Sequence, residues 1–97
     1  MFKNEFKLTG KLKFVEDHQT NNGNLIVTAV LGRGSKEKGY ENYKIKAFKD
    51  VATELLYVKE DTVITVTGWI TQDNWEKDGQ KFSKVVFCVK SFEEYKE

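Results

Sequence analysis

The alternation of apolar and polar residues near the start of the chain most constrains its fold. Phe6, Leu8, Leu12 and Phe14 stand at every second position, and Gly10 takes the remaining place in the same series. A period of two is typical of a strand with one buried face, since helices repeat every three to four residues. We therefore predict a strand over residues 6–14 with Phe6 and Phe14 in the core. Gly10 lets this strand coil sharply, as small barrels require.

Four further segments are predicted to be strands, and one segment between them is predicted to be a loop. Residues 25–31 follow the turn signal Asn22-Gly23 and are apolar at nearly every position, which predicts a strand covered on both faces. Residues 32–39 read as a flexible basic loop. Residues 40–49 alternate again, and residues 62–71 form the fourth strand. Asp78-Gly79 predicts the turn into a fifth strand over residues 82–92.

The expected faces and the expected helix follow from the same patterns. In the third strand Tyr43, Ile45 and Ala47 share the core face, and the opposite face carries Asn42, Lys44, Lys46 and Phe48. In the fourth strand the predicted core face carries Ile64, Val66, Gly68 and Ile70. A short helix follows the third strand, with Asp50 as its N-cap and its end near Tyr57. Its apolar side chains are Val51, Ala52, Leu55 and Leu56.

Three strands, a helix and two strands form the order of an all-β, five-stranded OB-fold barrel with a short helix between strands three and four. The same order fits an open α+β sheet. At 97 residues, the chain is expected to be a single domain over residues 1–97.

Composition excludes several classes of protein. There is no apolar run of membrane-spanning length and no signal-peptide pattern, so we expect a cytoplasmic protein without membrane contact. His18 is the single histidine and Cys88 the single cysteine, so one chain cannot build a zinc cluster, and we expect no metal, no cofactor and no enzyme activity. The net charge is only +1, so a basic surface requires that like charges segregate.

Five short motifs occur in order along the chain. They are Asn4-x-Phe6-x-Leu8-x-Gly10-x-Leu12, Asn22-Gly23 with its apolar run, Phe48-Lys49-Asp50-Val51-Ala52, the stretch from Gly68 to Trp75, and Asp78-Gly79 followed by Ser83-Lys84-Val85-Val86. Over residues 4–92 the chain thereby resembles the bacterial and phage-type single-stranded-DNA-binding proteins. The resemblance implies an OB-fold homo-dimer or homo-tetramer that binds single-stranded DNA without sequence preference in replication, repair or recombination.

The chain also departs from that family's pattern. Asp61 stands where a glycine usually closes the turn after the helix, and Lys84 replaces a common acidic residue. The sequence ends at Glu97 without the family's long acidic tail, so the recruitment of replication proteins that this tail performs is in doubt.

Binding of single strands requires aromatic faces for the bases and positive charge for the phosphates. The resemblance implies base stacking at Phe48 and Trp75; Phe48 also shares a strand face with Lys44 and Lys46, and Trp75 lies among polar residues beside a turn. Trp69 is a candidate for stacking or for a subunit interface. The remaining candidates are Tyr40, Arg33, Lys36, Lys38 and Lys77. Alternatively, the charged residues of the loop 32–39 are simply solvated and keep the loop soluble.

Two other functions stay open. An OB-fold adaptor of a replication or primosome complex, similar to primosomal replication protein B, would bind nucleic acid weakly and dock on a helicase or polymerase. An RNA binder similar to cold-shock proteins is disfavoured, because their aromatic-rich strand motifs are missing.

Overall fold

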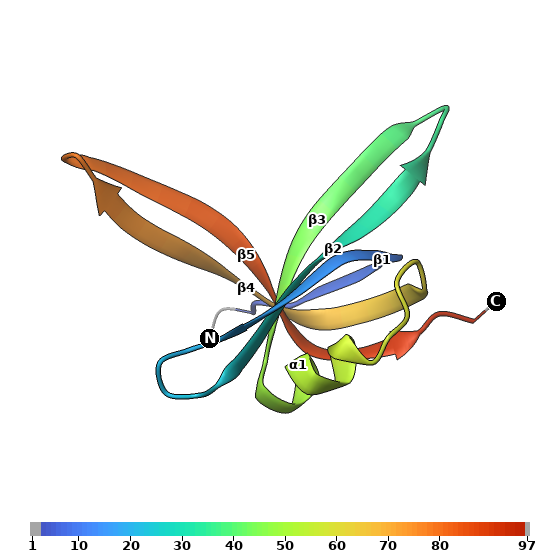
Figure 1. The fold of residues 1–97 in the computed structure, drawn as a ribbon. Helices are drawn as coiled ribbons and strands as arrows, with labels where there is room; N and C mark the ends of the chain where they lie inside the picture. The colour runs from blue at the N-terminus through green and yellow to red at the C-terminus, as the bar shows by residue number, and fades with distance from the viewer. Residues whose placement is uncertain (1–2, 97) are drawn as a thin grey trace.

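The structure, a computed structural model, describes residues 3–96, and nearly all of them belong to five strands and one helix (Figure 1). These elements are β1 (Phe6–Gln19), β2 (Leu25–Ser35), β3 (Gly39–Phe48), α1 (Lys49–Leu56), β4 (Val63–Lys77) and β5 (Gln80–Glu94). The strands close into a barrel in the order β1-β2-β3-β5-β4, with β4 pairing back onto β1. β3 and β5 run parallel, and the other neighbours run antiparallel. This confirms the predicted OB-fold and excludes the open α+β sheet.

The core lies where the alternation placed it. Leu12, Val27, Ile45 and Val66 have no solvent-exposed surface, and α1 contributes Ala52 and Leu55 to the same cluster. Phe6 and Tyr43 are partly buried and meet Phe87 edge-on, with ring centroids 5.2 and 5.9 Å apart. Gly10 is buried, and a Cβ there would lie 3.0 Å from the carbonyl oxygen of Gly32. The expected faces of β3 are confirmed.

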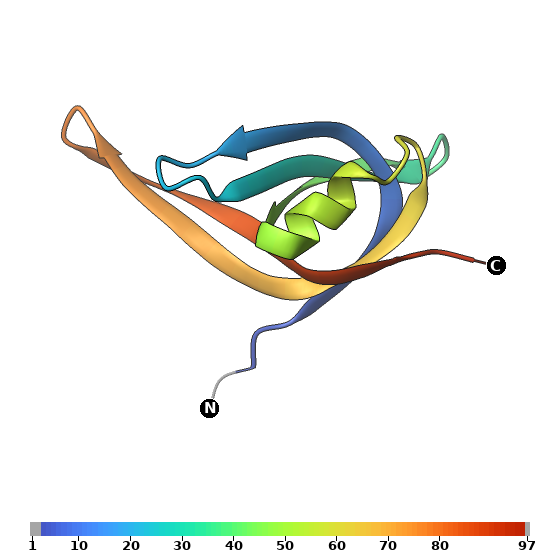
Figure 2. The same cartoon turned by 60° about the horizontal axis from the view of Figure 1, so that its bottom comes forward.

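Two hairpins extend beyond the barrel as separate arms (Figures 1 and 2). β2 and β3 stay paired out to Ser35 and Gly39, so most of the predicted loop 32–39 is strand and only residues 36–38 form the turn. β4 and β5 stay paired out to Lys77 and Gln80. Asp78 and Gly79 both have positive φ, which confirms the predicted turn. The fourth and fifth strands are therefore longer than expected.

The placement of Phe14 in the core is wrong. Its φ is 53°, and its side chain is 69% exposed. The pairing of β1 with β2 shifts register between Lys13 and Glu16, so an extra residue reverses which side chains face inward. Val15, the next residue, packs against the core instead.

Two further predictions need correction. Ile70 is exposed, because β4 pairs with β1 only as far as Gly68 and Ile70 lies beyond that point, on the β4–β5 arm. Asp50 is not the N-cap of α1: Phe48 holds that position without a side-chain hydrogen bond, and Asp50 lies in the first turn. The helix ends at Leu56 with Tyr57 as its C-cap, which confirms the predicted end near Tyr57. Across residues 3–96, no helix has the length and apolar character needed to cross a membrane.

Candidate nucleic-acid interface

One face of the sheet is continuous from β2 across β3 to β5 and β4, on the outside of the barrel. Ile26 lies opposite Phe48, and Thr28 lies opposite Lys46. Lys46 in turn neighbours Cys88 on β5, whose partner on β4 is Trp69. Because alternate residues of a strand share a face, the outward side chains of four strands form a single surface, called here the outer face.

The outer face is hollowed into a groove of about 340 Å³. Its lining residues come from all five strands: His18, Ile26, Thr28, Lys44, Ile45, Lys46, Asp73, Lys84, Val85 and Val86. It lies on the β2–β3 surface between the end of β1 and the base of the β4–β5 arm. OB-folds bind oligonucleotides on this surface and at these loops.

Positive charge segregates to the groove although the chain is nearly neutral. Lys44, Lys46 and Lys84 line it beside a single carboxylate, Asp73. The two ion pairs within residues 3–96 are His18–Glu16 and Arg33–Glu41, so no lysine of the groove is neutralised by one. These ammonium groups are available to phosphates.

Three predicted aromatic residues present exposed rings from the strands of the outer face. Phe48 is 37% exposed, and the Lys46 Nζ lies 5.8 Å from its ring centroid, within cation–π range. Trp75 is 46% exposed and stacks on Phe82, with ring centroids 5.7 Å apart. Trp69 lies on the same face of β4 as Trp75. It lines a separate hollow, however, with Asn4, Glu5, Thr67, Gly68 and Lys90. The structure therefore places Phe48 next to the groove and Trp75 on the arm that leaves it.

Tyr40 belongs to a second hollow farther along β2 and β3. Lys11, Lys13, Gly32 and Asn42 also line it, together with Arg33 and Gly34. The register places Lys11 beside Gly32 and Gly32 beside Asn42, so this hollow continues the outer face. Lys11 and Lys13 thus extend the basic surface from β1.

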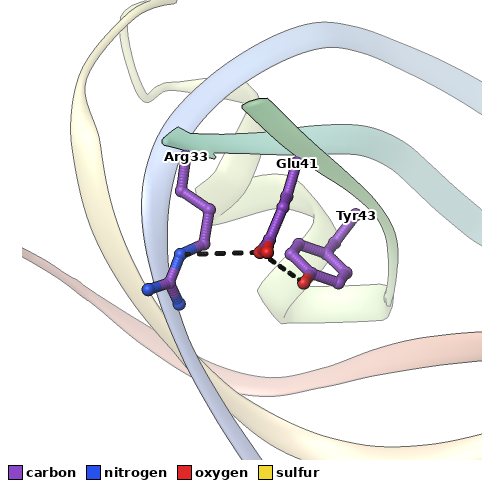
Figure 3. A network of polar contacts seen from close by, with 3 residues as sticks. All are labelled: Arg33, Glu41 and Tyr43. Carbon is purple, nitrogen blue, oxygen red and sulfur yellow. Dashed lines mark hydrogen bonds and ion pairs between the residues drawn. The ribbon is translucent and has the colours of Figure 1, made fainter. Parts of the chain in front are cut away.

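Arg33 is held away from the groove lysines by its own contacts. Its Nε lies 3.9 Å from Glu41 Oε2, and this carboxylate accepts a 2.6 Å hydrogen bond from the Tyr43 hydroxyl (Figure 3). The bond raises the pKa of Tyr43, and desolvation and the charge of Glu41 add to the effect. Tyr43 packs on the core side, so Arg33 shares the face opposite Lys44.

The other predicted cations are spread out. Lys36 and Lys38 lie in the exposed turn of the β2–β3 arm, and Lys77 ends β4 at the tip of the other arm. The structure does not bring them together with Lys44 and Lys46 in the groove.

Sequence reasoning missed the part played by His18, Thr28, Asp73 and Val86 in the groove. They lie on four different strands, and no local pattern marks residues that meet only through sheet pairing. Cys88 is buried, and this burial raises the pKa of its thiol. Within residues 3–96, no cluster of three or more histidine, cysteine or acidic side chains could hold a metal ion.

No protein-family model matches the sequence, and no curated protein matches it either. Solved structures do match. Two crystal structures of the protein PriB from Ralstonia solanacearum superpose with TM-scores of 0.74 and 0.76, at 18% and 19% identity. The matches cover 97% and 98% of this chain and all of PriB. The mitochondrial single-stranded-DNA-binding protein Rim1 of S. cerevisiae superposes with a TM-score of 0.77 at 17% identity. This match covers 99% of this chain and 98% of Rim1. The shared fold is the OB-fold. At such identities the likeness extends to the fold alone.

Proposed function

We propose that this protein binds single-stranded DNA across its outer face, without requiring a fixed sequence, in replication, repair or recombination. The observation that carries the proposal is the combination of exposed aromatic rings with lysines that form no ion pair within residues 3–96. The likeness to Rim1, whose name describes a single-stranded-DNA-binding protein, supports it.

In this proposal each kind of side chain has its own role. Bases stack on Phe48 and Trp75, at roughly 1–3 kcal/mol per base, and this contact tolerates any base because each has a π-face. Lys44, Lys46 and Lys84 hold phosphates along the groove between the two aromatic residues. Tyr40, Lys11 and Lys13 continue the path over the β2–β3 arm, since they line the adjoining hollow.

A homo-dimer or homo-tetramer is part of this proposal. One barrel offers a short footprint for a strand, and a second copy would lengthen it. The outward side chains of Val30 and Val63, which line neither the groove nor the second hollow, are only partly covered and could bury an interface. Sedimentation equilibrium measures the assembly state directly, and a strict monomer at all concentrations contradicts this part.

The test is a titration with oligo-dT at low salt, followed by tryptophan fluorescence. Binding is expected to quench the fluorescence, and the double variant Phe48→Ala, Trp75→Ala is expected to lose most of the affinity. Tyr57→Ala is the matched control, because Tyr57 is 86% exposed at the end of α1, outside the strands of the outer face. Absence of binding at micromolar protein refutes the function. Unchanged binding by the double variant refutes the site.

A second candidate is an adaptor in a replication complex, in which DNA binding is weak. The likeness to the two PriB structures favours it. One measurement separates the two candidates. An adaptor keeps its affinity for a helicase or polymerase when Phe48 and Trp75 are both replaced by Ala. In both cases the protein acts by binding and not by catalysis.

A further inference from the structure

The groove contains a group that does not suit a surface built only for phosphates. Asp73 is the carboxylate among its lining residues, and it lies opposite Lys84 across the β4–β5 arm. Within residues 3–96, its side chain makes no hydrogen bond and no ion pair. A negative charge here repels a polyanion, so it weakens binding unless it meets a hydrogen-bond donor of the ligand.

The rest of the lining suits a nucleobase. Ile26 and Val86 provide apolar surface, and Thr28 provides a hydroxyl beside them. A volume of about 340 Å³ is close to the lower limit of small-ligand sites, about 300 Å³, which suits one nucleotide. Around this space, Lys44, Lys46 and Lys84 donate hydrogen bonds, whereas Asp73 only accepts them.

We propose that Asp73 makes the groove a base-selective subsite that prefers cytosine over uracil and thymine. This inference rests on the proposed function and deepens it. Cytosine presents the N4 amino group, a donor, beside the acceptors N3 and O2. The carboxylate of Asp73 accepts from the amino group, and a lysine donates to the acceptors.

Uracil and thymine fit this arrangement poorly. Their N3–H stands between two carbonyl oxygens, so a carboxylate that accepts from it faces both oxygens and is repelled by them. At the position of the cytosine amino group they present the acceptor O4, which cannot pair with Asp73. The groove therefore distinguishes the substituent at C4, and binding elsewhere on the outer face remains indifferent to the base.

The simpler role for Asp73 is to balance the charge of Lys84 across the hairpin. Such cross-strand pairs contribute about 0.2–1 kcal/mol to sheet stability. A purely structural role changes stability and overall DNA affinity, but it cannot change the ratio of affinities for two bases. That ratio is the decisive measurement.

The experiment compares homo-oligonucleotides of deoxycytidine and deoxyuridine, about 12 nucleotides long to match one or two OB-fold footprints. These bases differ only at C4 and N3, and uracil removes the methyl group of thymine from the comparison. The wild-type protein is expected to bind the cytosine strand about 3- to 10-fold more tightly. Asp73→Asn should bring the two affinities within about twofold and tighten binding of the uracil strand, since a negative charge is lost.

Two further variants make the result decisive. Glu76→Gln removes the same charge from the opposite face of the same arm, so it should keep the preference. Asp73→Ser should lose it, like Asp73→Asn. An unchanged ratio in both Asp73 variants, or a wild-type preference for uracil, overturns the subsite while DNA binding stands. Failure to bind either oligonucleotide refutes the proposed function, and the subsite with it.

Discussion

The ring of Phe82 lies against the indole of Trp75 across the β4–β5 arm, with the planes 18° apart and the centroids 5.7 Å apart. The two residues are direct cross-strand partners. Phe82 therefore packs against one side of the indole and restricts its rotation, and the indole remains 46% exposed. Such pre-organisation reduces the entropy cost of binding a base.

Trp75→Ala is expected to weaken binding of oligo-dT by roughly 1–3 kcal/mol, because one stacked base is lost. Phe82→Ala should weaken it less, since the indole remains but is no longer held. Trp75→Phe is the control, and it should retain most of the affinity because a flat ring remains. Fluorescence anisotropy of a labelled strand gives the three affinities. A larger loss for Phe82→Ala than for Trp75→Ala would show that Phe82, not Trp75, contacts the base.

Replacing Lys44, Lys46 and Lys84 together by Gln is expected to reduce the salt dependence of binding. Each phosphate contact on a single strand contributes about −0.7 to the slope of log affinity against log salt, so the slope should become shallower by about 2. Lys59→Gln is the control, because Lys59 is exposed in the turn between α1 and β4, outside the strands of the outer face, and should leave the slope nearly unchanged. Titrations at several salt concentrations measure both slopes, and equal effects would contradict the charge track.

Asp61, in the turn before β4, has a φ of 74°, which lies in the left-handed region that favours glycine. A left-handed residue with a Cβ is strained, and aspartate tolerates this better than alanine. Asp61→Ala should therefore lower the free energy of unfolding by about 1 kcal/mol. Asp61→Gly should stay within about 0.5 kcal/mol of wild type, as relieved strain offsets the greater freedom of the unfolded chain. Urea denaturation measures both, and equal stabilities of the two variants would show that the turn is unstrained.

The hydrogen bond from Tyr43 to Glu41 makes stability depend on pH in the alkaline range. The bond raises the pKa of the phenol above its usual value of 10.0, because only the protonated phenol can donate to the carboxylate. The folded state thus holds this proton more tightly than the unfolded state. The stabilisation is complete below pH 10 and is lost as the pH rises through the folded-state pKa.

The variant Tyr43→Phe removes both the hydrogen bond and the titrating proton. Urea midpoints measured between about pH 9 and pH 11 should fall more steeply for the wild-type protein than for this variant. Parallel profiles would show that the bond does not persist in solution.

Local patterns predicted much of the fold. The alternation in residues 6–12 and in β3 located the core face, because burial of one sheet face imposes a period of two on the sequence. Asp78-Gly79 predicted its turn because both residues tolerate positive φ. The sequence did not predict the bulge at Phe14. Phe14 and Val15 are both apolar, so the pattern does not show which of them faces the core. The outer parts of the arms escaped it too, because strands exposed on both faces carry no apolar period.

By itself, then, the sequence determined the order of the strands, the place of the helix and the lysine-bearing face that carries Phe48. Only the tertiary structure decided that His18, Lys46, Asp73 and Lys84 line one groove and that Arg33 faces away from it. The physical reason is that alternation along a strand fixes a side chain's face within its own strand. Which side chains become neighbours depends on register and closure between strands that are distant in the sequence, and each residue shift reverses the face.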